Sequence, residues 1–359
     1  MITYLLTKYF PGIFMFGNVT FRAGMATITA LIISFVIGPK IIRLLRKNQI
    51  GESIKSYAPK THQAKSGTPT MGGFIILFSL LVPTILWAKL NYFVWLIIVA
   101  TAWMGIVGYI DDYLKVIRKK KKGLIARYKL VGQISLGLFF GIALLWFDFG
   151  TSTTIPFFKN LNLDWEYFFI PMVILVITGS SNAVNLTDGL DGLVAGLIGI
   201  CAVIFGLMAY VGGRSDFSEY LLIQHIPGVD ELAVFATAML GAGLGFLWFN
   251  SKPASVFMGD TGSLALGSAL GAMAILVKKE LLLPLVGGVF FIEALSVILQ
   301  VGFFKYSKRK KGIAKRLFKM APIHHHFELS GWDENKVVTR FWIIGLLLGL
   351  IAMVTFKVR

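Results

Sequence analysis

Long apolar segments make up most of the chain, and they constrain its fold more than any other feature. A helix needs about 20 mostly apolar residues to cross the hydrocarbon core of a bilayer. Backbone groups that cross lipid must be satisfied internally, which favours helices over loops or open sheets. The sequence therefore predicts an all-α polytopic integral membrane protein with about ten transmembrane helices. The predicted spans are Met25–Leu44, Met71–Trp87, Tyr92–Ile110, Leu130–Trp146, Phe168–Val184, Leu193–Val211, Leu232–Trp248, Leu264–Val277, Leu281–Phe304 and Val338–Phe356.

Composition favours one membrane-embedded domain, residues 1–359, over separate soluble domains. Hydrophobic residues make up 56% of the chain and charged residues 15%, with a mean hydropathy of +0.75. Soluble domains average about 25% charged residues. The segment Met1–Gly24 lacks a basic start and a cleavage site, so we expect an interfacial or re-entrant segment there. The segment after Asp260 is short, and Gly and Pro interrupt the segment near Leu281, so we expect one of these two helices to be broken or bent. Cys201 is expected to be a small packed residue.

Positive charge is concentrated in three loops, at residues 45–70, 113–129 and 305–337. The net charge is +17, and the alternate connections are poorer in Lys and Arg. Cytoplasmic loops of membrane proteins carry an excess of these residues. We therefore predict that the three basic loops are cytoplasmic and that both termini are periplasmic. This distribution explains the charge better than nucleic-acid binding does, so no nucleic-acid partner is expected.

Aspartates stand at the ends of several apolar segments, although a carboxylate beside hydrocarbon is energetically costly. Asp111 and Asp112 end a segment that runs toward the cytoplasm. Asp188 and Asp191 lie in the next cytoplasmic turn, and Asp260 follows a cytoplasmic stretch. Each motif also has a structural interpretation, as an interface cluster, an Asp-Gly turn or a helix N-cap. Their shared location nevertheless predicts an active site at the cytoplasmic face.

The aspartates belong to a set of polar motifs that suit a metal ion and a phosphate. Asn182 and Asn185 add hydrogen-bonding amides, and Gly259 flanks Asp260 where a helix begins, with free N–H groups that favour an anion. Phe257 can stack on a base or anchor at the interface. The five motifs are Lys65–Gly73, Gly108–Tyr113, Ser180–Gly192, Asn250–Gly262 and Ala321–Glu328.

Two of these motifs carry cations or histidines in basic loops. Lys65 and Thr70 suit contacts with phosphate or nucleotide, although the spacing of a P-loop is absent. His324, His325 and His326 are consecutive, without the Cys or HExxH partners of a zinc site. Their basic surroundings favour hydrogen bonds to a phosphate.

Together the motifs indicate phosphoryl transfer at a membrane surface. Hard oxygen ligands favour Mg²⁺ or Mn²⁺. Cations and backbone amides suit a diphosphate, and the location suits one water-soluble and one lipid substrate. Such a reaction depends mainly on positioning and charge neutralisation.

The motifs resemble those of a known enzyme family along nearly the whole chain. The matching stretches are KSGTPTMGG, GYIDDYLK, NAVNLTDGLDGL, FMGDTGSLALG and APIHHHFELSGW. The aspartate motifs are similar to those of the polyprenyl-phosphate N-acetylhexosamine-1-phosphate transferases. The triple histidine with Gly331 and Trp332 resembles the phospho-N-acetylmuramoyl-pentapeptide transferase branch.

The resemblance implies a Mg²⁺-dependent enzyme of the bacterial cytoplasmic (inner) membrane. It implies transfer of phospho-MurNAc-pentapeptide from UDP-MurNAc-pentapeptide to undecaprenyl phosphate, giving lipid I and UMP, the first membrane step of peptidoglycan synthesis. The second pKa of a phosphate monoester is near 6. The lipid phosphate is then largely dianionic at neutral pH, which favours direct in-line attack. A two-step route with Asp111 as a covalent nucleophile is the alternative.

The resemblance also implies roles for individual residues. Asp111, Asp112, Asp260 and His324 correspond to the catalytic set, with Asp260 as the expected metal ligand. Phe257 and Asn250 are expected near the uracil, and Lys129 and Gln133 near the lipid phosphate. The expected substrate-binding residues are Lys65, Thr70, Lys129, Gln133, Asn182, Asn185, Asp188, Asp191, Asn250, Phe257, His325 and His326.

Two other functions are open on the sequence alone. A sibling transferase would use UDP-GlcNAc and the same aspartate motifs. A secondary transporter would place ionisable groups at mid-membrane, and Glu293 deep in an apolar segment fits that pattern, although a buried structural group, protonated or paired, explains it better. The sequence leaves open the oligomeric state, with a homodimer among the alternatives, the lipid entry route and the separate roles of Asp111 and Asp112.

Overall fold

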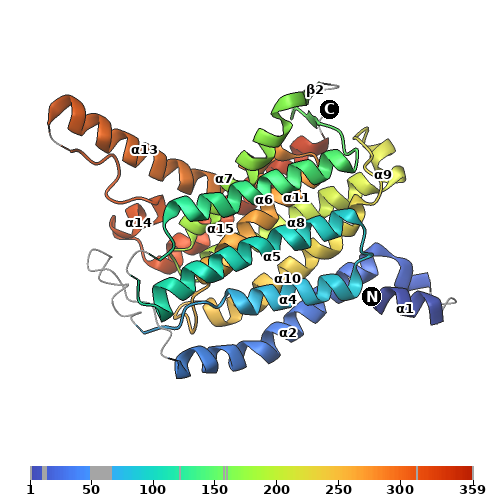
Figure 1. Cartoon of the computed structure of the whole chain (residues 1–359), viewed down its shortest axis with the longest axis horizontal. Coiled ribbons are helices and arrows are strands. Elements are labelled where there is room, and N and C mark those ends of the chain that lie inside the picture. Colours follow the sequence, from blue (N-terminus) through green and yellow to red (C-terminus); the bar gives the residue numbers. More distant parts are fainter. Residues whose placement is uncertain are drawn as a thin grey trace.

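The chain folds into a bundle of long helices (Figure 1), which confirms the predicted all-α polytopic membrane protein. The computed structural model describes residues 2–9, 14–48, 67–120, 123–156, 158, 161–312 and 314–357. The long helices are α2 (Val19–Lys47), α4 (Gly73–Trp87), α5 (Tyr92–Asp112), α6 (Ala126–Trp146), α7 (Phe169–Thr187), α8 (Leu193–Gly213), α10 (Leu232–Asn250), α11 (Gly259–Leu276), α13 (Gly288–Lys311) and α15 (Glu334–Lys357).

Short elements connect these helices. One antiparallel pair of strands joins α6 to α7, with Thr153 opposite Leu163. The short helices are α1 (Ile2–Tyr9), α9 (Ser215–Tyr220), α12 (Leu283–Val286) and α14 (Ile323–Glu328). The single turns are η1 (Phe14–Gly17), η2 (Tyr113–Ile117), η3 (Glu166–Phe168), η4 (Val229–Glu231) and η5 (Glu280–Leu282), and the strands are β1 (Ser152–Thr154) and β2 (Asn162–Asp164).

Eight helices in the described part of the chain are long and apolar enough to cross a membrane, two fewer than the ten predicted. Helix α4 is apolar but only 15 residues long. Helix α11 is rich in Gly, Ala and Ser and does not reach a membrane-like hydropathy. The eight are Val19–Lys47, Tyr92–Ile117, Ala126–Trp146, Glu166–Thr187, Leu193–Gly213, Val229–Asn250, Gly288–Lys310 and Glu334–Phe356.

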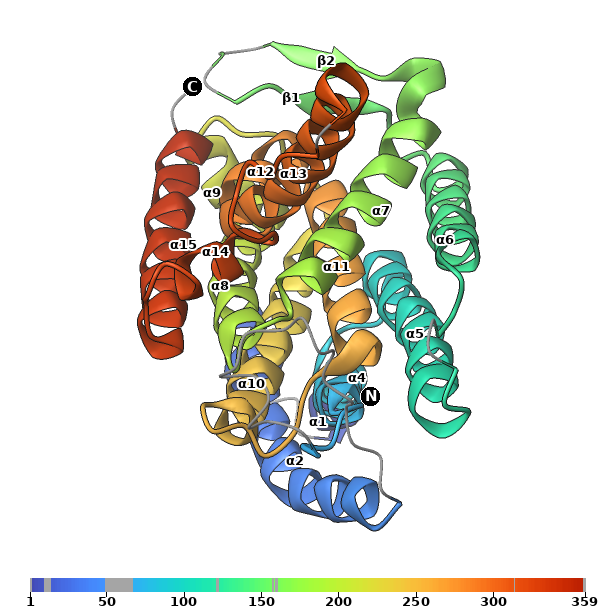
Figure 2. The same cartoon turned by 90° about the vertical axis from the view of Figure 1, so that its left-hand side faces the viewer.

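Helix α11 lies at the centre of the bundle, between α5 and α7 in Figure 2. Every residue from Thr261 to Leu276 is buried. Small residues allow neighbouring helices to approach closely, which is how membrane helices pack without a hydrophobic driving force between them. Because other helices cover α11 on all sides, its own surface does not need a lipid-like composition.

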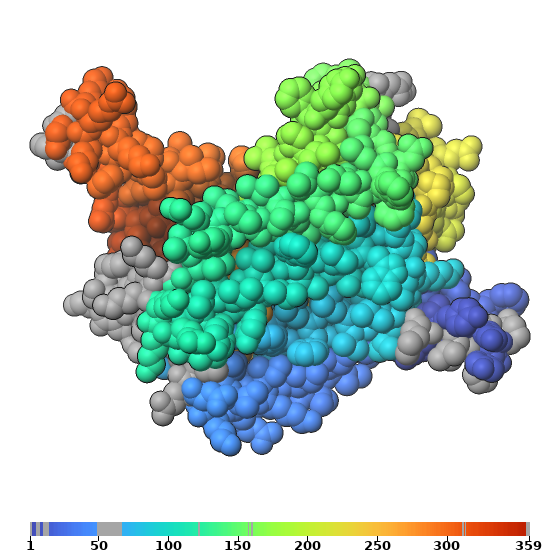
Figure 3. All heavy atoms as spheres, viewed as in Figure 1, coloured from blue at the N-terminus to red at the C-terminus, as the bar shows by residue number. Residues whose placement is uncertain are grey.

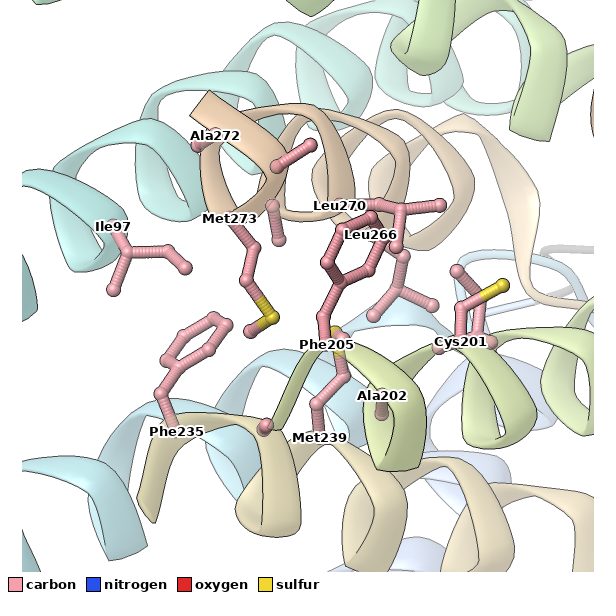
Figure 4. Packing of buried hydrophobic residues seen from close by; sticks show 14 of the residues in the cluster. Ile97, Cys201, Ala202, Phe205, Phe235, Met239, Leu266, Leu270, Ala272 and Met273 are labelled. Atoms are coloured by element: carbon pink, nitrogen blue, oxygen red, sulfur yellow. The ribbon is translucent and has the colours of Figure 1, made fainter. Parts of the chain in front are cut away.

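Apolar side chains from α5, α8, α10 and α11 meet in the part of the core that Figure 4 shows. Leu266 and Met273 of α11 lie near Phe205 of α8, Phe235 of α10 and Ile97 of α5, and all five are buried. Cys201 also lies in this core and is buried, as predicted. The packing fixes α11 among its neighbours and therefore fixes the position of its first residues.

The chain is broken after Leu281, as the sequence predicted. The turn η5 leads into the short helix α12, and Gly287 separates α12 from α13. The far end of α13 stands out from the bundle at the upper left of Figures 1 and 3.

Both labelled chain ends lie toward the right of Figure 1, on the side opposite α14.

A buried cluster of charges lies at the end of α11 away from Asp260. The Thr153 hydroxyl donates to Oε2 of Glu280 (2.7 Å), and the Lys279 ammonium donates to Oγ1 of Thr154 (2.6 Å). The Lys278 ammonium lies 4.7 Å from the ring centroid of Phe149. Burial raises the pKa of Glu280 to about 7, although the Thr153 hydrogen bond and the two lysines lower it.

We predict that Glu280→Gln reduces the loss of thermal stability that the protein undergoes as the pH rises. The folded-state pKa of about 7 lies above the ordinary 4.5, so this group's contribution to stability is full below pH 4.5 and is lost as the pH rises through 7. The maximum loss is about 3 kcal/mol, at 1.36 kcal/mol per pKa unit. Glutamine mimics the neutral acid, so the variant's thermal midpoint in detergent should exceed that of the wild type near pH 8. The two midpoints should converge near pH 5. The prediction would be contradicted if the plots of thermal midpoint against pH ran parallel for the variant and the wild type.

Candidate active site

The end of α5 meets the start of α11, and this contact brings three of the predicted aspartates together. Gly108 makes the contact close, because a Cβ atom added there would lie 2.2 Å from the carbonyl oxygen of Asp260. Asp111 and Asp112 follow Gly108 by less than one and a half turns of the helix. The glycine therefore allows their carboxylates to reach the first residues of α11.

Asp111 and Asp260 share the same two lysine ammonium groups. The Lys115 ammonium lies 2.8 Å from Oδ2 of Asp111 and 2.8 Å from Oδ2 of Asp260. The Lys129 ammonium lies 2.5 Å from Oδ2 of Asp260 and also contacts Oδ2 of Asp111. The Leu124 N–H donates to the other oxygen of Asp111. The two carboxylates thus face one region that is occupied by positive charge.

Asp112 has a different set of partners, all at the N-terminus of α11. Its Oδ2 accepts hydrogen bonds from the Thr261 N–H (2.9 Å) and hydroxyl (2.7 Å), and its Oδ1 accepts one from the Asp260 N–H (3.1 Å). Helix N-termini leave such N–H groups without partners inside the helix. Asp112 therefore caps α11 from another helix, while Asp111 faces the lysines.

Helix α7 adds a row of amides beside this cluster. The Asn185 amide donates to Oδ1 of Asp260 and to Oγ of Ser263, both at 2.8 Å. One turn earlier, the Asn182 amide donates to Oε1 of Gln133 (3.1 Å). Gln133 is fully buried, and its own amide donates to Ser181. The structure thus joins Asn185 directly to the aspartate cluster and pairs Asn182 with Gln133 of α6.

The turn between α7 and α8 is tied to the loop before α11. Oδ2 of Asp191 accepts a hydrogen bond from the Ala254 N–H (3.1 Å). Oδ1 of Asn250 accepts one from the Gly192 N–H, and the Asn250 amide donates to the Val256 carbonyl, both at 2.9 Å. Asp188 is half-buried in the same turn. The side chains of Asp191 and Asn250 therefore hold the walls of the site, and their contacts with a substrate stay predictions.

The segment before α4 pairs with the same loop. The Phe257 N–H donates to the Pro69 carbonyl, and the Gly72 N–H donates to the Phe257 carbonyl, both at 2.8 Å. Thr70 is buried next to α11, because a Cβ atom added at Gly259 would lie 3.1 Å from its hydroxyl oxygen. The Phe257 side chain is half-buried. Lys65 lies outside the described residues.

The three histidines of α14 have different partners. Nδ1 of His325 lies 2.8 Å from Oε2 of Glu328, and Nδ1 of His326 accepts a hydrogen bond from the Lys319 N–H (3.1 Å). His324 is fully buried, and its Nδ1 lies 3.2 Å from Oε2 of Glu293. Glu293 is therefore buried and paired, as predicted. The three imidazoles thus have three different partners within the protein, and their contacts with a phosphate stay predictions.

The aspartate cluster suits a divalent cation that is shared with a substrate. Mg²⁺ is commonly held by one or two carboxylates together with substrate phosphates, rather than by a complete protein cage. Asp111 and Asp260 direct carboxylate oxygens to the same two lysine ammonium groups. Both oxygens of Asp112, in contrast, accept hydrogen bonds from the start of α11. Across the described residues, no group of three or more His, Cys, Asp or Glu side chains forms a ready metal site.

The structure adds Lys115, Thr261 and Ser263 to the residues that the sequence predicted. Lys115 stands four residues after Asp111, in the π-helical turn η2 that extends α5. That spacing places both on one face of a continuing helix, and it was a usable signal, but the predicted span ended at Ile110. Thr261 and Ser263 contact the cluster only because α5 and α7 flank α11.

Comparisons with known proteins show the family to which the chain belongs. The family described as glycosyl transferase family 4 matches residues 94–278, which include α5, α7 and the start of α11. Curated relatives named phospho-N-acetylmuramoyl-pentapeptide-transferase match the full chain. The protein from Chloroherpeton thalassium is 53% identical over 97% of this chain and 96% of its own length. Those from Thermodesulfovibrio yellowstonii and Pelodictyon phaeoclathratiforme are 50% and 51% identical, over all of this chain and at least 99% of their own lengths.

A multi-pass helical bundle with a carboxylate and lysine cluster at its helix ends defines the class, a membrane-embedded glycosyl transferase of family 4. Within that class, the chain belongs to the phospho-N-acetylmuramoyl-pentapeptide-transferase family. It is accordingly a multi-pass protein of the bacterial inner membrane.

We predict that Asp112 and Asp111 variants separate stability from chemistry. Asp112→Ala removes three hydrogen bonds from the start of α11, and loss of a helix cap costs about 0.5 to 2 kcal/mol. The thermal midpoint in detergent should therefore fall, and Thr261→Ala, which removes one of the three, should lower it less. Asp111→Asn leaves the cap intact and should reduce turnover with a smaller change in midpoint. Equal midpoints for Asp112→Ala and the wild type would refute the capping role.

Proposed function

We propose that this protein transfers phospho-MurNAc-pentapeptide from UDP-MurNAc-pentapeptide to undecaprenyl phosphate, producing lipid I and UMP. The observation that carries the proposal is the pair of carboxylates, Asp111 and Asp260, that share Lys115 and Lys129 at the helix ends. Lysine ammonium groups beside carboxylates suit a phosphate and its counterion. The full-length similarity to relatives that carry the transferase's name supports the choice of substrates.

We further propose ten spans, with both termini periplasmic and the site at the cytoplasmic face. Counting α4 and the buried α11 with the eight apolar helices gives the ten. Two observations support the orientation: the chain ends share the side of the bundle opposite α14, and the basic segments 113–129 and 305–337 contain the site residues Lys115 and Lys129 and the predicted catalytic His324.

The lysines and amides are proposed to prepare the two phosphates for reaction. An oxygen of the lipid phosphate attacks the sugar-bearing phosphorus of the UDP-sugar, and the bond to the UMP oxygen breaks in line. Lys115 and Lys129 offset the negative charge on the phosphates, and Asn185 keeps Asp260 in place. Mg²⁺, held by Asp111 and Asp260, would supply further charge neutralisation at the leaving phosphate.

Direct attack is favoured over a covalent route through Asp111. Its carboxylate is fully buried, contacts two ammonium groups, and accepts a hydrogen bond from the Leu124 N–H. Both carboxylate oxygens are therefore already in contact with protein groups, which leaves neither oxygen free to attack phosphorus. The remaining predicted residues are proposed to bind the nucleotide sugar (Asn182, Asp188, Asp191), the uracil (Asn250, Phe257), phosphate or ribose (Lys65, Thr70), the lipid phosphate (Gln133), and a phosphate (His325, His326).

The experiment is an assay of UMP release in detergent with Mg²⁺, a polyprenyl phosphate and each UDP-sugar in turn. We expect release with UDP-MurNAc-pentapeptide. Asp260→Asn should reduce release by about 100-fold or more, since loss of one electrostatic group at a reaction centre typically costs that much. Asp216→Asn, in an exposed ion pair with Arg214, is the matched control and should match the wild type.

Each contrary result identifies a different error. Release only with UDP-GlcNAc would indicate the sibling transferase, and no release with either sugar would favour the transporter. A phospho-MurNAc adduct trapped on the enzyme without lipid acceptor would establish the two-step route. Near-normal release by Asp260→Asn would show that the cation site is elsewhere.

A further inference from the structure

Glu293 is a buried acid for which the reaction described above has no role. It lies in α13 with 0% of its surface exposed. An isolated carboxylate in such a position is costly unless it is neutralised or paired. Its partner among the described residues is His324, whose Nδ1 lies 3.2 Å from Oε2 of Glu293.

Glu293 and His324 are each other's polar contact in the buried interior. His324 is also 0% exposed and comes from α14, a different element of the chain. In the described part of the structure, neither carboxylate oxygen of Glu293 and neither ring nitrogen of His324 has a hydrogen bond of good geometry, and the 3.2 Å contact between the two side chains is the polar contact that they share. Shifting a proton between the two is therefore the direct way to satisfy both.

The other ring nitrogen of His324 points toward the predicted nucleotide-sugar turn. A Cβ atom added at Gly189 would lie 2.4 Å from Nε2 of His324. Gly189 stands between Asp188 and Asp191, so only a residue without a side chain allows the ring to approach the turn this closely. Nε2 is a buried polar atom without a hydrogen-bond partner in the described structure, and it abuts Gly189 in the turn that is proposed to bind the nucleotide sugar.

We propose that Glu293 is a positioning residue, which shares a proton with Nδ1 of His324 so that Nε2 carries a hydrogen for the diphosphate of the substrate. The proposal rests on the proposed function. With one shared proton the pair is neutral overall, and Nε2 bears a hydrogen whether the shared proton is on Glu293 or on Nδ1. Without that proton the pair has a net negative charge, which is costly when buried and repels a phosphate.

The hydrogen bond from Nε2 is expected to strengthen as negative charge moves toward the leaving UMP. An interaction that is stronger in the transition state raises kcat more than it lowers KM. Removing the side chain that contacts a catalytic imidazole is expected to lower kcat about 10- to 100-fold, by analogy with the side chains that contact metal-bound histidines. Glu293 would therefore act through His324, without touching the substrate.

The test compares kcat and KM for UMP release by the full-length protein with UDP-MurNAc-pentapeptide. Glu293→Gln should lower kcat about 10- to 100-fold and change KM by less than about 3-fold. In a double-mutant cycle with His324→Gln, the second substitution should add no further loss, because both remove the same interaction. Glu280→Gln, a buried acid at the opposite end of α11, is the matched control and should keep the wild-type kcat.

Gly189→Ala provides an independent test of the positioning role if Glu293→Gln does not fold. Its methyl group would meet Nε2 of His324 and displace the buried ring, so it should lower kcat even at a temperature well below its thermal midpoint, where the variant is folded. Wild-type kcat in Glu293→Gln or in Gly189→Ala would overturn the positioning role, as would losses that add to those of His324→Gln. An inactive wild type would instead refute the proposed function, so the two failures are distinguishable.

Discussion

The site depends on the attachment of α11 to the end of α5. Asp112 supplies hydrogen-bond acceptors for the first N–H groups of α11, and Gly108 removes the side chain that would keep the two backbones apart. Once this contact is made, Asp260 lies opposite Asp111, and the lysines of η2 and α6 can bridge them. One helix cap therefore determines the distance between the two carboxylates that are proposed to hold a cation.

Much of this arrangement could be predicted from the sequence, because hydropathy and charge are local properties. The helices around Asp111, Asp188 and Asp260 were found from runs of apolar residues, and the break after Leu281 from Gly and Pro. Helix α11 was found in the same way, although its buried surface has no need to resemble lipid and its hydropathy does not qualify it as one of the eight candidate spans. The predicted number of spans therefore exceeds the number that length and composition support.

The pairing of side chains could not be predicted in the same way, because it depends on how distant segments pack. Asp112 and Thr261 are 149 positions apart, and nothing in either motif specifies that one caps the other. Glu293 and His324 belong to different helices, and the sequence indicated only that Glu293 needed a partner. The internal bonds of Asn250 and Asp191 were likewise invisible, since Asn and Asp suit turns and ligands equally well.

The burial of α11 has a consequence for how the protein is made. A helix rich in Gly, Ala and Ser gains little by entering lipid alone, and its free energy of insertion depends on neighbours that cover it. Helix α5 precedes it in the chain and α7 packs along it, so both are available to receive α11 as it is synthesised. Insertion of this helix and completion of the carboxylate pair are therefore one step of biogenesis, and a chain that fails at the first cannot acquire the second.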